Sequence, residues 1–100
     1  MNDQEIYQKI GELLWSVMPK EAVEIHFIGC IYSDYSAGGT EWLTVKNTID
    51  SFEMGERPYL IEDQLMDHIL NLNSLDIFKE KWTHFRFKLT DQGRFNAEFG

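Results

Sequence analysis

Apolar and polar residues alternate most regularly near the end of the chain, in residues 82–100. Apolar side chains occupy every second position of 85–89 and again of 95–99, and polar side chains fill the positions between them. A period of two over both segments predicts two half-buried antiparallel strands. Residues 90–93 form the predicted turn, in which Gly93 can adopt a positive φ. Because a hairpin with one apolar face is not stable alone, the rest of the chain must cover it.

Residues 3–18 show helical spacing instead. Their apolar positions form one stripe: Ile6, Ile10, Leu13, Leu14 and Val17. Such a stripe predicts an amphipathic helix, with Tyr7 and Trp15 at the edges of the stripe. Asn2 can cap the first turn, and Pro19 ends the helix because the residue before a proline avoids the helical conformation.

A second helical stripe follows Pro58 and extends to about Asn73. Its apolar members are Ile61, Leu65, Ile69 and Leu72. Three acidic residues of this segment, Glu62, Asp63 and Asp67, fall beside the stripe and are expected to face solvent.

The segment between the two helices predicts strands. Residues 22–34 alternate at first and become apolar on both faces from Ile28 onward, which is typical of a central strand. The glycine-rich residues 36–39 predict a turn, and residues 41–47 predict a second strand. Residues 48–58 are compatible with a short third strand or with a packed loop.

Together these elements predict a single α+β domain over residues 1–100. Their order is helix, strand, strand, an optional third strand, helix, strand, strand. The most economical packing places both helices on one face of an antiparallel sheet of four to five strands. No apolar run is long enough to span a bilayer, the N-terminus is acidic, and the one cysteine, Cys30, cannot form an internal disulfide. The cytoplasm is therefore the expected location.

The formal net charge is −8, and it is unevenly distributed along the chain. Residues 1–78 carry −10, whereas residues 79–100 carry +2. Because a chain this acidic repels phosphates, nucleic acid is not an expected partner. The charge favours a basic protein partner through electrostatic steering. The alternative is that the acidic residues only keep a small protein in solution.

The sequence lacks the residue patterns that catalysis or cofactor binding requires. His26, His68 and His84 are scattered and lie at no metal-ligand spacing with Cys30. We expect the histidines to be partly exposed and the cysteine, which lies in an apolar strand, to be unreactive. Two aspartates one turn apart in the second helix are a weak cation site without further oxygen ligands. No phosphate loop, dinucleotide fingerprint or nucleophile elbow is present, so the protein is not predicted to be an enzyme, and no metal or cofactor is expected.

An acidic segment, residues 50–67, carries a net charge of −5 and has apolar residues interleaved with its carboxylates. Protein interfaces combine a few large apolar anchors with a charged rim. The segment therefore predicts a surface that binds a partner, with carboxylates for steering and aromatic side chains as anchors. The candidate residues are Trp42, Asp50, Phe52, Glu53, Glu56, Tyr59, Glu62, Asp63 and Asp67. The alternative is a solvated loop and helix face, with Phe52 in the core.

The C-terminal segment resembles the end of YezG-like immunity proteins. The resemblance lies in Trp82-Thr83, the strand that follows, Asp91-Gln92-Gly93-Arg94-Phe95 and the closing strand that ends at Phe99. The order of an amphipathic helix, strands, an acidic region and a second helix is also similar. The resemblance implies a small cytosolic bacterial antitoxin that binds a basic nuclease toxin domain and blocks it, without catalytic residues of its own. A related possibility is the immunity protein of a contact-dependent growth inhibition system.

Two other kinds of function remain open from the residues. An exposed edge of the sheet could pair with a strand of a partner, which would make the protein an adaptor module. A small enzyme or ligand-binding domain would need a deep pocket with converging polar groups, and no residue pattern requires one. The chain is expected to be a monomer or a weak dimer.

Overall fold

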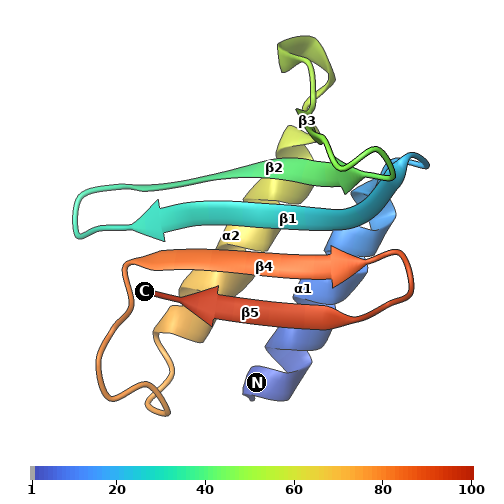
Figure 1. Cartoon of the computed structure of the whole chain (residues 1–100). Coiled ribbons are helices and arrows are strands. Elements are labelled where there is room, and N and C mark those ends of the chain that lie inside the picture. The colour runs from blue at the N-terminus through green and yellow to red at the C-terminus, as the bar shows by residue number, and fades with distance from the viewer. Residues whose placement is uncertain (1) are drawn as a thin grey trace.

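Five strands form one antiparallel sheet, and two helices cover one of its faces (Figure 1). The computed structural model describes residues 2–100. The elements are α1 (Asp3–Val17), β1 (Ala22–Ile31), β2 (Ser36–Thr44), β3 (Ile49–Ser51), the 3-10 helix η1 (Met54–Glu56), α2 (Tyr59–Asn73), β4 (His84–Thr90) and β5 (Phe95–Phe99). The strand order across the sheet is β3-β2-β1-β4-β5. This arrangement confirms the predicted α+β fold. Of the two alternatives left open for residues 48–58, a short third strand forms at Ile49–Ser51.

The core lies between the sheet and the helices. In the centre of the sheet, Phe27 of β1 lies opposite Thr40 of β2 and Phe87 of β4. Both phenylalanines are fully buried. The helices cover them with aliphatic side chains, which are Ile6, Ile10 and Leu14 from α1 and Leu65, Ile69 and Leu72 from α2. Because burying one such side chain stabilises the fold by about 2 kcal/mol, these two stripes hold the helices on the sheet.

The C-terminal hairpin forms as its alternating pattern predicts. β4 and β5 pair from Phe85 opposite Phe99 to Leu89 opposite Phe95. Gly93 closes the turn with a φ of 85°, a conformation that glycine adopts without steric cost. The hairpin forms one side of the sheet, with β5 at its edge.

The helix boundaries also agree with the sequence pattern. Asn2 Oδ1 accepts a hydrogen bond of 2.9 Å from the Glu5 backbone N–H and so caps α1. α2 begins directly after Pro58 and ends at Asn73, whose Nδ2 donates to the Trp82 carbonyl oxygen at 2.9 Å. This bond ties the end of α2 to the residues that lead into β4. Within residues 2–100, no helix has the length and apolar character needed to cross a membrane.

The glycine-rich segment 36–39 is part of a strand, so the prediction of a turn there was wrong. The turn lies just before it, where the Tyr32 N–H donates to the Tyr35 carbonyl oxygen at 2.8 Å. β2 starts at Ser36 and ends at Thr44, earlier than predicted, and β1 likewise ends before the predicted boundary. Glycine occurs in turns, but it also occurs where close packing leaves no room for a side chain. The second reason applies in this segment.

The close packing involves two glycines on neighbouring strands. Gly29 of β1 lies opposite Gly38 of β2. A Cβ on Gly38 would lie 2.7 Å from the Phe27 ring, and a Cβ on Gly29 would lie 2.6 Å from the Phe85 ring. The two glycines therefore make room for the aromatic rings of the core.

We predict that Gly29→Ala destabilises the protein by about 3 kcal/mol, because its Cβ would overlap the Ala37 carbonyl oxygen and lie 2.8 Å from the Gly38 Cα. The measurement is the free energy of unfolding in urea. Gly39→Ala is the matched control, since nothing lies within 4 Å of its Cβ position and its effect should stay below about 0.5 kcal/mol. Equal stabilities for the two variants would contradict the packing argument.

Candidate protein-binding surface

Residues 49–58, called the tip here, leave the sheet at the β3 edge and project beyond it (Figure 1). β3 pairs with β2 over only three positions, Glu41–Leu43, before the chain turns into η1. Large apolar side chains remain exposed on the tip, with Met54 at 82% and Ile49 at 54% of full exposure. A contiguous patch of exposed apolar side chains marks a surface that binds another protein, whereas single exposed side chains are common on any protein.

Five carboxylates are exposed on the tip and on the adjoining outward side of α2. They are Asp50, Glu53, Glu56, Asp63 and Asp67. None of them forms an ion pair with a residue in the described part of the chain. We call these five residues the acidic surface. Because no cation compensates it, its negative charge is available to a partner.

Glu62 is the one acidic member of the predicted set that is buried, with 5% exposure, so the prediction that it faces solvent was wrong. Thr40 Oγ1 donates to its Oε2 at 2.8 Å, and Arg57 Nε donates to its Oε1 at 3.0 Å. Arg57 Nη2 also lies 3.0 Å from the same Oε1 and completes the ion pair. The spacing contained a signal for this position, because Glu62 precedes the buried Leu65 and Ile69 by three and seven residues, the interval of a helical stripe. A carboxylate is tolerated there because it is paired and hydrogen-bonded.

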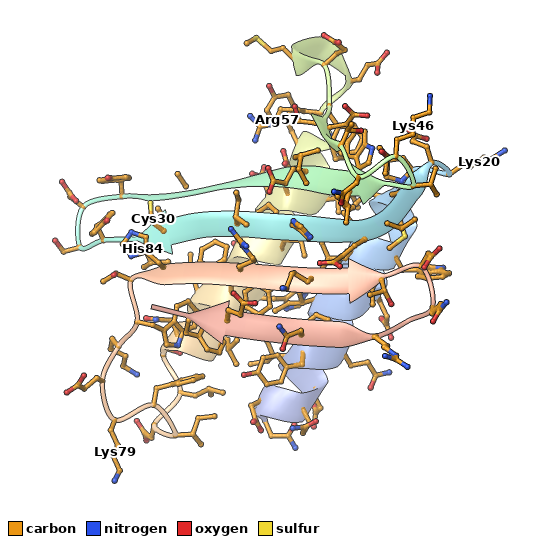
Figure 2. All side chains as sticks on the ribbon, in the orientation of Figure 1. Lys20, Cys30, Lys46, Arg57, Lys79 and His84 are labelled. Atoms are coloured by element: carbon orange, nitrogen blue, oxygen red, sulfur yellow. The ribbon has the colours of Figure 1, made fainter. Side chains whose placement is uncertain are left out.

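Arg57 is a residue of this region whose contacts the sequence did not indicate. Its hydrogen bonds to Glu62 raise the pKa of its guanidinium above the ordinary value, so Arg57 stays charged. Its guanidinium carbon also lies 5.0 Å from the centre of the Tyr59 ring. Arg57 and Glu62 neutralise each other, so the acidic segment keeps its net charge of −5 on the exposed carboxylates. Lys46, on the turn before β3, lies on the other side of the tip (Figure 2).

The predicted aromatic anchors differ in accessibility. Trp42 is buried at 6% exposure because its side chain points toward the helices, so it is not accessible as an anchor in this structure. Phe52 is half-buried and packs against Trp42, with ring centres 4.7 Å apart. Tyr59 is 53% exposed, and Leu60, which the sequence did not indicate, is more exposed still. The accessible anchors are therefore Met54, Tyr59 and Leu60.

A hollow of about 450 Å³ lies beneath the tip. Its lining includes Thr40, Phe52, Met54, Arg57 and Tyr59. Arg57 is the charged residue among those that line the hollow, and it is bonded to Glu62. The apolar part of the wall comes from Phe52, Met54 and Tyr59.

On the open face of the sheet, polar and charged side chains contact one another. His26 is buried rather than partly exposed as predicted, with Nε2 at 2.7 Å from Glu24 Oε1 and Nδ1 at 3.4 Å from Glu41 Oε1. Lys88 Nζ lies 2.9 Å from Glu98 Oε1, and this hydrogen bond lowers the pKa of the Glu98 carboxyl. The open face therefore differs from the acidic surface, whose charges have no such partners.

Cys30 and His84 face each other across β1 and β4 at one end of the open face (Figure 2). His84 is held by two hydroxyls, with Tyr32 at 3.2 Å from Nε2 and Thr83 at 2.9 Å from Nδ1. Over residues 2–100, no three His, Cys, Asp or Glu side chains lie close enough together to hold a metal ion. Cys30 lies in β1, as predicted, but it is half-buried rather than enclosed by apolar residues.

Neither a comparison with models of known protein families nor one with curated proteins gives a match. Of the residues predicted to bind a partner, the structure exposes Asp50, Glu53, Glu56, Tyr59, Asp63 and Asp67 on the tip and α2. Of the remaining three, Trp42 and Glu62 are buried and Phe52 is half-buried.

We predict that Arg57→Ala destabilises the protein by about 2 kcal/mol, because it leaves the buried Glu62 carboxylate without its ion-pair partner. The measurement is the free energy of unfolding in urea. Adding Glu62→Gln to Arg57→Ala should recover much of the loss, since no buried charge then remains. Glu56→Ala, at an exposed neighbouring site, is the control and should change stability by less than about 0.5 kcal/mol. A double variant no more stable than Arg57→Ala would contradict the assigned role.

Proposed function

We propose that this protein is an immunity protein, an antitoxin that binds a basic bacterial nuclease toxin domain and blocks its substrate groove. The observation that supports the proposal best is the acidic surface, whose five exposed carboxylates form no ion pair with any residue of 2–100. The protein is proposed to act in the cytoplasm as a monomer or weak dimer, without a metal, a cofactor or a catalytic reaction of its own.

The chemistry of the two surfaces is complementary. A nuclease groove presents lysines and arginines that hold the phosphates of nucleic acid. Carboxylates on a rigid helix and a projecting tip can contact the same lysines and arginines in place of the phosphates and form charge-assisted hydrogen bonds with them. Nucleic acid is then excluded because the inhibitor already fills the groove.

Met54, Tyr59 and Leu60 give this surface the apolar contacts that charge alone does not provide. Rim charges mainly increase the rate of encounter, whereas desolvated apolar and aromatic side chains keep a complex together. These three residues lie among the carboxylates, with Tyr59 and Leu60 at the start of α2 and Met54 in η1. The surface therefore combines steering and anchoring in one region.

The resemblance to YezG-like immunity proteins supports the same proposal from a different part of the chain. It rests on the residues of the β4–β5 hairpin, which forms at the edge of the sheet opposite the tip. The hairpin therefore contributes to the scaffold, and the acidic surface is proposed to contact the toxin.

An adaptor that accepts a strand from a partner is the second candidate, and one observation favours it. β3 pairs only with Glu41–Leu43 of β2. On the side of β2 that faces away from β1, residues Ser36–Thr40 therefore have no neighbouring strand within residues 2–100. The Thr44 N–H donates to Thr48, which shows that even-numbered residues of β2 direct their backbone groups toward this edge. Arg57 Nη2 donates to the Gly38 carbonyl oxygen at 3.4 Å and so covers part of the edge. A charged side chain over an edge disfavours strand addition, which is why this candidate ranks second.

We predict that Asp63→Lys with Asp67→Lys slows association with the basic nuclease domain encoded beside this chain by about tenfold at low salt. The reason is the loss of attraction at a rim where both side chains are exposed. The measurement is the association rate at several salt concentrations, and the wild-type rate should fall more steeply with salt. Glu21→Lys with Glu80→Lys changes the net charge equally at exposed sites outside the acidic surface and should have a smaller effect.

Absence of any complex with a basic nuclease domain in low salt would overturn the proposed function. Equal association rates for the two double variants would show that α2 is not part of the interface and that only the total charge of the protein affects association.

We predict that Ser36→Pro leaves toxin binding unchanged, because it removes a backbone N–H only from the free edge of β2. Circular dichroism confirms that the variant is folded, and calorimetric titration measures the affinity. Loss of binding in a folded Ser36→Pro variant, together with normal binding in the Asp63→Lys and Asp67→Lys variant, would favour the adaptor.

A further inference from the structure

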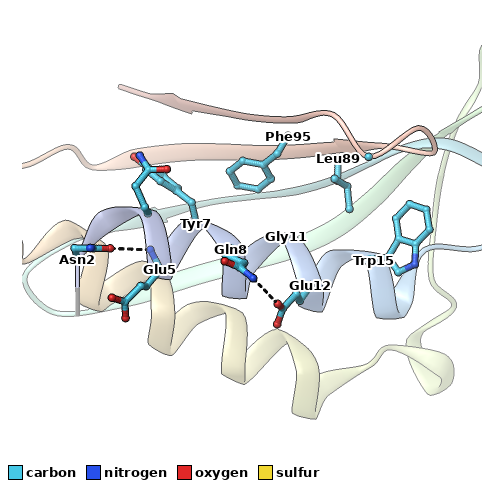
Figure 3. A pocket seen from close by; sticks show the side chains of 11 residues that line it. Asn2, Glu5, Tyr7, Gln8, Gly11, Glu12, Trp15, Leu89 and Phe95 are labelled. Carbon is cyan, nitrogen blue, oxygen red and sulfur yellow. Dashed lines mark hydrogen bonds between the residues drawn. The ribbon is translucent and has the colours of Figure 1, made fainter.

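An apolar groove runs between α1 and the β4–β5 hairpin, at the edge of the sheet opposite the tip (Figure 3). It has a volume of about 690 Å³ and is open to solvent. Leu89 and Phe95 point from the hairpin toward the helix, where Tyr7 and Trp15 line the two ends of the groove. The groove exists because α1 lies under β1 and β4 and leaves the inward side of β5 partly uncovered.

The helix side of the groove is a stripe of its own. Tyr7, Gly11 and Trp15 recur every four residues, beside the core stripe of α1. Tyr7 is half-buried and packs on Phe95, with ring centres 5.9 Å apart. Trp15 is 56% exposed, although an indole gains much from burial. A large aromatic side chain left exposed beside an apolar groove is typical of an interface.

Gly11 lies in the middle of this stripe, and the packing of the chain does not require a glycine there. A Cβ on Gly11 would lie 3.7 Å from Phe95 Cδ2, which is ordinary van der Waals contact. Glycine disfavours the helix interior relative to alanine, so this residue weakens α1 without a gain inside the domain. Its effect is to leave the floor of the groove open between Tyr7 and Trp15 (Figure 3).

The rim of the groove is acidic. The charged side chains that line it are Glu5 and Glu12, together with neutral polar side chains. Lys9 does not line the groove, and within residues 2–100 it forms no ion pair with either carboxylate. An occupant must therefore match an apolar floor and a negative rim. A second copy of this chain, with a net charge of −8, meets that requirement poorly.

We propose that the groove is a second docking site, and that its occupant is a segment of a partner protein with a large apolar side chain flanked by lysines or arginines. The apolar side chain lies over Gly11, between Tyr7 and Trp15, and the basic side chains pair with Glu5 and Glu12. This site does not use the carboxylates of the tip or α2, so it stands or fails independently of the proposed immunity function.

The experiment uses the full chain and a synthetic amphipathic helical peptide with leucine on one face and lysine on the other. Backbone amide chemical shifts locate the peptide, and a titration gives its affinity. We expect the largest shifts at Tyr7, Gly11, Trp15 and Phe95. Gly11→Leu fills the floor of the groove and should weaken binding about tenfold, whereas Gly11→Ala should weaken it far less.

Two controls separate docking in the groove from general attraction to an acidic protein. A peptide with glutamate in place of every lysine should not bind. Glu21→Gln with Glu80→Gln removes two charges at exposed sites that do not line the groove and should leave the affinity unchanged, whereas Glu5→Gln with Glu12→Gln should reduce it. Thermal unfolding confirms that each variant is folded.

Three results would overturn the proposal. The first is absence of saturable binding, or shifts that map to the tip or the open face instead of the groove. The second is unchanged affinity in a folded Gly11→Leu variant. The third is equal binding of the glutamate peptide, or equal loss of affinity from the Glu21/Glu80 and Glu5/Glu12 double variants.

Discussion

The cover of one apolar sheet face by only two helices is the constraint on which the rest of this structure depends. Phe27 and Phe87 are fully buried at the centre of that face because both helices, each of 15 residues, place their aliphatic stripes over them. Toward the two edges of the sheet the cover is incomplete. At one edge the chain projects as the tip, and at the other the inward side of β5 borders an open groove. Both candidate binding surfaces therefore arise where the helical layer ends.

Charge is arranged in a way that complements this packing. On the open face, Lys88 pairs with Glu98, and His26 lies between two carboxylates. Beneath the tip, the only arginine of the acidic segment pairs with the only buried carboxylate of that segment. A buried ion pair adds little net stability, since desolvation offsets most of the attraction. Its consequence here is that the remaining five carboxylates stand uncompensated, so a field suited to a cationic partner extends from the tip and α2.

Much of the scaffold could be predicted because it depends on local periodicity. The alternation in 85–99 and the helical stripes of α1 and α2 each report which side of an element is buried, and the structure agrees with them except at Glu62, which lies on the buried side of α2. The glycines of β2 were misread because the same residue type serves turns and close packing. Gly38 permits the contact with Phe27, a residue eleven positions earlier in the chain, and no local pattern contains that information.

The sequence by itself determined the class of fold, the order of its elements, the net charge and the position of the acidic segment. Each of these follows from composition or from the pattern of near neighbours. Only the tertiary structure decided which members of the candidate site reach solvent. Glu62 is buried because Arg57 and Thr40 meet it there, and Trp42 is buried because its position in β2 points at the helices. Periodicity indicates the side of α2 on which Glu62 lies, but it cannot show that Arg57 and Thr40, from other segments, supply the partners that allow a carboxylate to be buried there.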